Sequence, residues 1–341
     1  MPSEWRVLEA PSVSYGKANL YFPVIELLRG YFSLTEASES AKVQSAVAEQ
    51  VLGLSPTLGD TIPPILALLG ALPREQNYSE PTAYAALPEV SLAVAKFQNL
   101  EPQERRRQTF DALLRLFLSE SEKQPLLLVF EDLHWIDGES AALLNVLVEN
   151  LARGRIFLLV NYRPGFSHTW ANRDYYTRLR LTPLPSTGAQ ELLDSLLGSD
   201  DALAALKELL IARTDGNPFF VEESVRSLAE AGVLVGARGS YRAAVRVDSV
   251  RIPNKVQTVL AERIDRLPRA EKQLLQSAAV IGVTVPVRLL RAVVGLAEEE
   301  LRRILDNLQA AEFLRESNLF PELEYQFNHA LSNEVAYGAL L

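Results

Sequence analysis

The stretch LLLVFEDLHWID, residues 126–137, decides the class of fold. Residues 126–130 are all apolar, a run typical of a parallel strand that is buried on both faces. Glu131 and Asp132 follow at once, which predicts two carboxylates at the carboxyl edge of a sheet, where doubly wound folds bind their ligands. A solvated acidic turn after a core strand is the alternative. This stretch alone leaves both interpretations open.

Strand and helix patterns alternate around this stretch. Residues 5–10, 156–160 and 178–181 predict further strands, and residues 139–152 carry an apolar face at helical spacing. Strands that alternate with helices indicate a parallel sheet covered on both sides. Apolar residues at helical spacing also predict helices over residues 24–31, 38–52, 65–72 and 110–118.

The chain downstream of Pro185 has an almost wholly helical pattern. Thr187 and Gln190 fit a capping box that opens a helix running to residue 197. A helix over 202–214 ends in an Asp-Gly pair, and Pro218 opens the next helix, which stops at residue 232.

The last part of the chain predicts helices followed by a β-hairpin. Two short strand patterns lie at 232–235 and 241–247. Helices are expected at 254–267, 270–279, 286–294 and 298–311, then strands at 313–316 and 325–328 and a terminal helix. Helices followed by a two-stranded wing indicate a winged-helix domain.

Composition excludes several classes of protein. The chain has 341 residues, no cysteine, three histidines and a net charge of −9. These values exclude disulfides and thiolate chemistry, disfavour a metal cluster, and make nucleic acid an unlikely partner. No apolar run approaches the roughly 20 residues that span a bilayer, and no secretory signal opens the sequence. We therefore expect a cytoplasmic protein with no membrane segment.

Residues 126–137 resemble the Walker B segment of the STAND ATPases. The similarity is greatest to the AAA+-like P-loop ATPase regions attached to bacterial class III adenylate and guanylate cyclases and to large transcriptional activators. Other segments resemble the same family in the same order: WRVLEAPSVSYGKANLYFPVIELLR at 5–29, NYRP at 161–164, DGNPFFVEE at 215–223 and FNHALSNEVAYGALL at 327–341. The resemblance covers nearly the whole chain.

The resemblance implies an α/β fold in three parts. Residues 1–184 are expected to form a partial P-loop NTPase parallel sheet, residues 185–253 an α-helical lid and residues 254–341 a winged-helix domain. It also implies ATP or ADP with Mg²⁺ as cofactors. Glu131 and Asp132 are then the metal ligands and catalytic acids: the first holds Mg²⁺, directly or through water, and the second orients or deprotonates the attacking water.

Four more residues receive cofactor-binding roles from the resemblance. Arg163 would face the γ-phosphate, Gly216 and Pro218 would form the Gly-x-Pro motif whose proline packs on the adenine, and His329 would reach the β-phosphate. Each also has a structural interpretation. Arg163 would be an ordinary surface arginine, Gly216 and Pro218 would stop one helix and start the next, and His329 would be a packing or capping histidine.

The sequence departs from the family at the phosphate-binding loop. No Gly-x-x-x-x-Gly-Lys-Ser/Thr occurs in it, and the nearest string, SYGKAN around Lys17, has one glycine and no Ser/Thr after the lysine. We expect the first strand and the phosphate loop to lie before Met1, and the C-terminal repeat region to be missing too. The family's strand order is 5-1-4-3-2. Without the first strand, we expect a sheet of three to four strands with residues 178–181 displaced.

Three functions follow from these observations. The first is a regulatory ATPase acting as a nucleotide-dependent switch, deficient in ATP binding as it stands, with a cyclase or DNA-binding effector in the parent protein. The second is a winged-helix transcriptional regulator, which the acidic helix at 298–311 disfavours. The third is a non-catalytic interaction scaffold derived from an ATPase. The sequence does not separate the first from the third.

Overall fold

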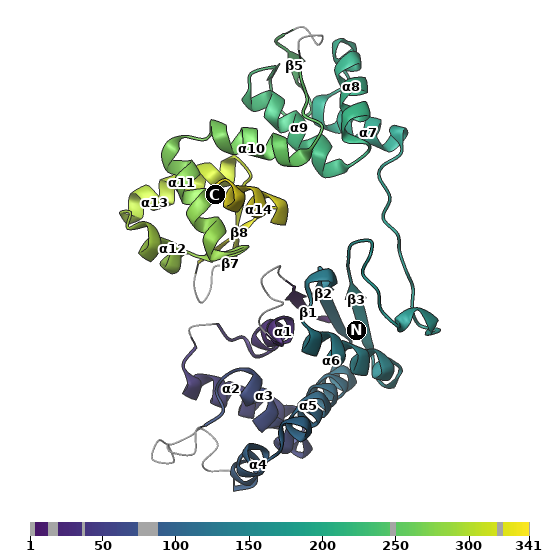
Figure 1. The fold of residues 1–341 in the computed structure, drawn as a ribbon, viewed down its shortest axis with the longest axis vertical. Coiled ribbons are helices and arrows are strands. Elements are labelled where there is room, and N and C mark those ends of the chain that lie inside the picture. Colours follow the sequence, from purple (N-terminus) through teal and green to yellow (C-terminus); the bar gives the residue numbers. More distant parts are fainter. Residues whose placement is uncertain are drawn as a thin grey trace. The chain divides into compact units, whose positions relative to one another are not determined.

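A computed structural model describes residues 4–12, 20–35, 38–73, 88–245, 250–318 and 323–340. The chain divides into two compact units, residues 1–178 and 179–341, and each is considered by itself (Figure 1). Among the described residues, no helix is long and apolar enough to cross a membrane.

The first unit combines a small sheet with several helices. Its strands are β1 (Arg6–Pro11), β2 (Leu126–Glu131) and β3 (Ile156–Val160). Its α-helices are α1 (Phe22–Phe32), α2 (Ser40–Leu54), α3 (Ile62–Leu68), α4 (Pro88–Gln98), α5 (Pro102–Lys123) and α6 (Gly138–Asn150). Short 3₁₀ turns include η2 (Pro56–Thr61), η3 (Leu133–Trp135), η4 (Leu151–Arg153) and η5 (Trp170–Asn172). The predicted helices over 24–31, 38–52, 65–72, 110–118 and 139–152 are confirmed, with shifted ends.

The sheet of the first unit is parallel, in the order β1-β2-β3. Its register pairs Leu8 with Leu128 and Leu128 with Leu158. The three predicted strands and their neighbours are therefore confirmed. The fourth predicted strand, residues 178–181, is wrong: this segment is unpaired, and the side chains of Leu179 and Leu181 are 83% and 87% exposed. The expected displacement of this segment from a three-stranded sheet is confirmed.

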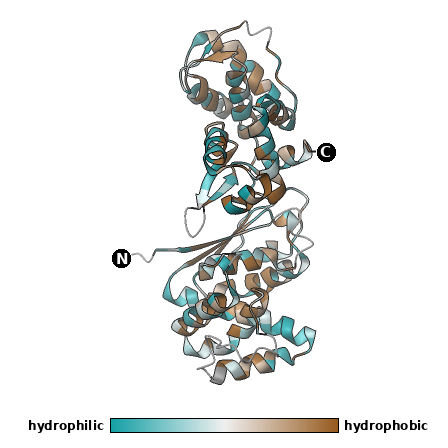
Figure 2. Ribbon diagram, turned by 90° about the vertical axis from the view of Figure 1, so that its left-hand side faces the viewer, coloured by the Kyte–Doolittle hydropathy of each residue, from teal (hydrophilic) through white to brown (hydrophobic). Residues whose placement is uncertain are grey.

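Helices cover one face of this sheet in the described part of the chain (Figures 1 and 2). On that face, Leu8, Leu126 and Leu128 are buried in a core shared with α1, α5 and α6. The opposite, outer face is apolar but open. It carries Trp5, Val7, Leu127, Val129, Phe157 and Leu159 together with the charged Glu9, and Phe157 and Leu159 are 54% and 49% exposed. The expectation of a sheet covered on both sides is therefore wrong here, because a run of apolar residues does not reveal which of its two faces has a partner.

The second unit contains two separate hydrophobic cores. The first core is built from α7 (Ser186–Leu197), η6 (Asp201–Leu203), α8 (Ala204–Thr214), α9 (Pro218–Glu230) and the strands β4 (Leu234–Val235) and β5 (Arg242–Ala243). The capping box at Thr187 is wrong, since Pro185 takes the N-cap position and no side chain caps α7. The stops at Gly216 and Gly232 are confirmed by positive φ angles of 68° and 70°.

The second core lies within residues 254–340. It is built from α10 (Val256–Arg266), α11 (Arg269–Ile281), α12 (Val287–Val294), α13 (Glu298–Ala310) and α14 (Ala330–Gly338) with β6 (Thr284–Pro286), β7 (Leu314–Asn318) and β8 (Glu324–Phe327). The predicted hairpin is confirmed as β7 and β8. Strand β6 was not predicted, and it extends the hairpin to an antiparallel sheet in the order β6-β8-β7.

Candidate functional site

The carboxyl ends of all three parallel strands meet at one edge of the sheet. Strand β1 ends at Pro11, opposite Glu131 at the end of β2, and the backbone N–H of Ser12 donates to the Glu131 carbonyl at 3.0 Å. The backbone N–H of Asn161, just past β3, donates to the carbonyl of Phe130 at 3.2 Å. The structure therefore brings Glu131, Asp132 and the start of the NYRP segment to this edge.

Asp132 has an unusual backbone conformation. Its φ of 54° lies in the left-handed region, which costs a non-glycine residue on the order of 1–2 kcal/mol. The side-chain Oδ1 of Asn161 accepts from the Asp132 N–H at 2.6 Å, and the Leu133 N–H donates to the Asn161 carbonyl at 3.0 Å. Asn161 thus holds the turn that directs the Asp132 carboxylate. No role was predicted for Asn161, whose place directly after a strand is the one local feature that singles it out.

The Asp132 carboxylate remains accessible at this edge. Its side chain is 44% exposed, and its Oδ1 lies 3.8 Å from Nδ1 of His134. Glu131 is exposed as well. Two accessible carboxylates match the way proteins bind Mg²⁺, through one or two carboxylates plus substrate phosphates. The donor set therefore fits a magnesium–nucleotide site, although no group of three acidic or histidine ligands occurs among the described residues.

Asp137 fixes the end of the 126–137 stretch. Its buried Oδ1 caps α6 by accepting from the N–H groups of Glu139 and Ser140, both at 3.0 Å, and it also accepts from the Tyr21 N–H at 3.1 Å. The Glu139 carboxylate binds Arg106 at 2.6 Å and the Tyr21 hydroxyl at 2.7 Å. These bonds, that of Arg106 first, lower the pKa of Glu139. Asp137 is thus structural: it ties α1 and α6 together beside the acid pair.

Arg163 begins an ordered turn beyond β3. The Phe166 N–H donates to the Arg163 carbonyl at 3.3 Å, and Gly165 takes the positive φ of 101° that such a turn needs. Arg163 itself is exposed. Its backbone lies two residues from Asn161 and so belongs to the same edge as Asp132.

An aromatic cluster supports this turn. Nε2 of His168 lies 3.0 Å and 3.2 Å from the hydroxyls of Tyr162 and Tyr176, which are themselves 3.0 Å apart. Nδ1 of His168 accepts from the Trp170 N–H at 3.3 Å, and the two rings stack. Burial, and secondarily the charge of Arg178, lowers the pKa of His168. The neutral imidazole is therefore the form that these contacts require.

Gly216, Pro218 and His329 lie in the second unit. Gly216 is buried, and a Cβ there would lie 2.2 Å from the Leu184 carbonyl oxygen. Close packing therefore requires glycine at this position. Pro218 is the exposed first residue of α9. The His329 ring lies 4.0 Å from the Phe219 ring and makes no capping bond, so of its two structural interpretations packing is the one seen. Desolvation lowers the pKa of His329, against the opposing charge of Glu223.

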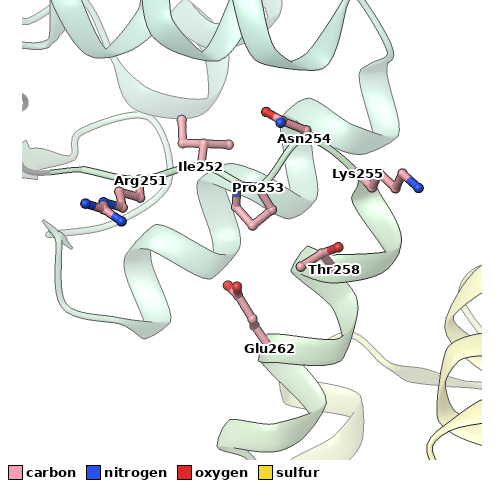
Figure 3. A pocket seen from close by; sticks show the side chains of 7 residues that line it. All are labelled: Arg251, Ile252, Pro253, Asn254, Lys255, Thr258 and Glu262. Carbon is pink, nitrogen blue, oxygen red and sulfur yellow. The ribbon is translucent and has the colours of Figure 1, made fainter.

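The second unit also has an open pocket of about 560 Å³ (Figure 3). Residues 251–255, Thr258 and Glu262 line it. None of the predicted site residues is among them. The string around Lys17 lies outside the described residues.

Comparison with known proteins gives one match to the first unit and one to the second. Residues 5–160 match a model described as AAA ATPase domain, and residues 185–235 match a domain of unknown function (DUF8739). The first match covers less than half of the chain and includes both Glu131 and Asp132. It supports a P-loop ATPase region over these residues, in agreement with the mixed α/β fold and its parallel sheet.

Individual relatives are more distant. An uncharacterized protein of Rhizobium meliloti (strain 1021) is 28% identical over 255 residues, which are 71% of this chain and 23% of that protein. The chain thus spans about a quarter of that relative's length. A Walker-type ATPase of Pyrococcus abyssi is 11% identical, with 98% of this chain and 91% of that chain covered and a TM-score of 0.25. Structural similarity at this TM-score does not establish a common fold or function.

Proposed function

We propose that this chain carries the nucleotide-binding and switch portion of a STAND-type regulatory ATPase, with its nucleotide site at the carboxyl edge of the β1-β2-β3 sheet. The observation that carries the proposal is the acid pair Glu131–Asp132, held at the end of β2 by Asn161. The AAA ATPase domain match over residues 5–160 supports it.

The two acids have different tasks in this proposal. Glu131, with Asp132 near it, would hold Mg²⁺, which when bound would neutralise phosphate charge. Asp132 accepts a hydrogen bond from the attacking water and takes up its proton. Arg163 stabilises the negative charge that builds up on the γ-phosphate.

The second unit supplies the switch. Residues 185–253 act as the lid, in which Pro218 packs on the adenine, and residues 254–341 act as a winged-helix domain whose His329 reaches the β-phosphate. The exposure of Pro218 is compatible with this contact. Gly216 holds the entry of α9 by its close approach to Leu184.

A partner segment completes the site. We propose that a strand, a Walker A phosphate loop and a helix of the longer parent pair with the free edge of β3 and cover the outer face of the sheet. Exposed Phe157 and Leu159 alternate along β3 as expected for a strand whose second face awaits a helix. A C-terminal repeat region and a cyclase or DNA-binding effector belong to the same parent, which is cytoplasmic. Without the phosphate loop, ATP binding is weak.

A non-catalytic scaffold is the second candidate, and the open outer face favours it. In that case the face binds another protein and the acids are idle. A DNA-binding role is disfavoured, because α13 begins with Glu298, Glu299 and Glu300 and a phosphate backbone repels such a helix.

Metal binding separates the two candidates in the chain as it stands. Titration with Mn²⁺, monitored by electron paramagnetic resonance, is expected to detect a site that weakens at least about tenfold in Glu131→Gln, since loss of even an outer-shell partner costs roughly that much. Asp132→Asn, whose proposed task is the attacking water, is expected to weaken it less. The matched control is Glu299→Gln with Glu300→Gln, two exposed neighbouring acids on α13. Equal Mn²⁺ affinity in the unsubstituted chain and in both acid variants would support the scaffold instead.

A further inference from the structure

The two cores of the second unit are joined by an open segment of chain. Residues 250–255 lead into α10 along the pocket of about 560 Å³; Ile252 is buried in the first core, whereas Arg251, Asn254 and Lys255 are exposed (Figure 3). A direct bond across this joint runs from Arg213 Nη1 to Asn254 Oδ1 at 2.5 Å, on the surface. A single hydrogen bond on the surface does not by itself fix one core against the other.

A buried guanidinium connects the two cores beside the packing of α10 on α9. Arg263 of α10 is 1% exposed at its side chain and uses its whole donor fork. Its Nε donates to Glu230 of α9 at 2.9 Å, its Nη1 donates to Glu223 of α9, and its Nη2 donates to the Ala311 carbonyl, after α13, at 2.8 Å. The guanidinium also lies 4.6 Å from the centre of the Phe313 ring. We call Arg263, Glu223, Glu230 and the Ala311 carbonyl the Arg263 clamp.

The clamp extends toward the His329 turn. Arg226 of α9 pairs with both Glu223 and Glu312. The Glu312 carbonyl accepts from Asn328 Nδ2 at 2.6 Å, next to His329, whose ring contacts Phe219 at the start of α9. Helix α9 is therefore tied to residues 254–340 at both of its ends.

Burial makes these ion pairs different from surface ones. Glu223 is 2% exposed, so moving α9 away from α10 would leave a buried carboxylate and a buried guanidinium unpaired. Arg266 makes the surface counterpart on the same helix: it is 36% exposed and lies 3.6 Å from Glu230. Exposed ion pairs of that kind contribute little to the free energy that holds two helices together. The resistance of this joint to opening thus depends on Arg263.

We propose that Arg263 is a positioning residue that makes residues 186–340 a single rigid body. Helix α9 and the His329 turn then keep a fixed geometry, and the joint at 250–255 is not a hinge. The consequence for nucleotide binding rests on the proposed function: Pro218 and His329 reach or leave the nucleotide together.

Spin labels measure this rigidity directly in the full chain. The protein has no cysteine, so Glu208→Cys on α8 and Arg303→Cys on α13, both exposed, place one label on each core. Double electron–electron resonance is expected to give one narrow distance peak in this labelled parent. Arg263→Lys, which keeps the charge but loses the fork, is expected to lose that peak to a broad distribution. The matched control Arg266→Lys is expected to keep it.

Two results would overturn the proposal: a broad distribution in the labelled parent, or an unchanged narrow peak in Arg263→Lys. If Arg263→Lys does not fold by circular dichroism, the combination Arg263→Met, Glu223→Gln, Glu230→Gln replaces it, because it removes the ion pairs without leaving a buried charge. An unchanged narrow peak in this combination would overturn the proposal as well. No nucleotide enters the experiment, so failure of ATP binding leaves this result standing.

Discussion

At the scale of single residues, Asn161 controls the geometry of the acid pair. Its amide oxygen accepts from the N–H of left-handed Asp132, which directly follows β2 and lies 29 positions earlier in the chain. No local pattern announces a bond across that separation. The sequence therefore predicted the acids and their edge, and it missed the residue that holds one of them in place.

Asn161→Ala is expected to loosen the turn after β2. The change removes the acceptor of a hydrogen bond worth about 1 kcal/mol, and it leaves the left-handed strain of Asp132 without compensation. Hydrogen exchange of the Asp132 and Leu133 amides is expected to accelerate roughly five- to tenfold for that loss. Asn161→Asp keeps an acceptor and is the control. Unchanged exchange in Asn161→Ala would show that the turn does not depend on this side chain.

His168 makes the first unit sensitive to acid. Its folded pKa is lowered by burial and by Arg178, so the unfolded chain binds more protons just below its ordinary pKa of about 6.5. The contribution of His168 to stability is therefore constant above that pH and falls as the pH drops below it. The groups that face the ring are Tyr162, Tyr176 and Arg178. Denaturant midpoints followed by tryptophan fluorescence at pH 7 and 5.5 are expected to differ less in His168→Gln. An equal difference in both proteins would contradict this account.

At the scale of elements, the close approach of Leu184 to Gly216 anchors the entry to α9. The Leu184 N–H donates to the Gly216 carbonyl at 2.8 Å, and a Cβ on Gly216 would meet the Leu184 carbonyl oxygen at 2.2 Å. Gly232 offers a matched control, because its φ of 70° is nearly equal to the 68° of Gly216 and nothing lies within 4 Å of its added Cβ.

Gly216→Ala is therefore expected to be clearly worse than Gly232→Ala. The control carries only the left-handed cost of about 1–2 kcal/mol, while the first adds a backbone clash and should exceed about 3 kcal/mol. Hydrogen-exchange protection of the α8 and α9 amides reports the loss. Equal effects of the two substitutions would mean that the close contact with Leu184 does not affect stability.

Elements with a strong local pattern were predictable, and those decided by distant partners were not. The stripe on α5 and the run of β2 needed only periodicity. Strand β6 spans Thr284–Pro286, too short to show alternation, and pairs with residues some 40 positions later. Leu179 and Leu181 follow the alternating pattern of a strand, but this pattern does not show whether a neighbouring strand is present to form the hydrogen bonds. The same limit hid the Arg263 clamp, whose partners lie 33 to 48 residues away.

At the scale of the whole molecule, the open outer face of the sheet is a liability when the chain is alone. Phe157→Thr with Leu159→Thr is expected to reduce self-association and dye binding with little loss of stability, since both side chains are about half exposed. Leu158→Thr, on the covered face of the same strand, is expected to destabilise the unit instead. Light scattering and denaturant midpoints measure the two effects. Strong destabilisation by the outer-face pair would mean that this face is already covered.

The most direct test of the central claim uses a fusion that supplies the phosphate loop. A strand, a Gly-x-x-x-x-Gly-Lys-Ser/Thr loop and a helix are placed before Met1, and ATP binding and hydrolysis are measured with and without Asp132→Asn. We expect the fusion to bind ATP far more tightly than the unfused chain. We also expect Asp132→Asn to keep ATP binding while hydrolysis falls about 100-fold or more, as for loss of a general base. Equal ATP affinity with and without the loop, or full turnover in Asp132→Asn, would contradict the account.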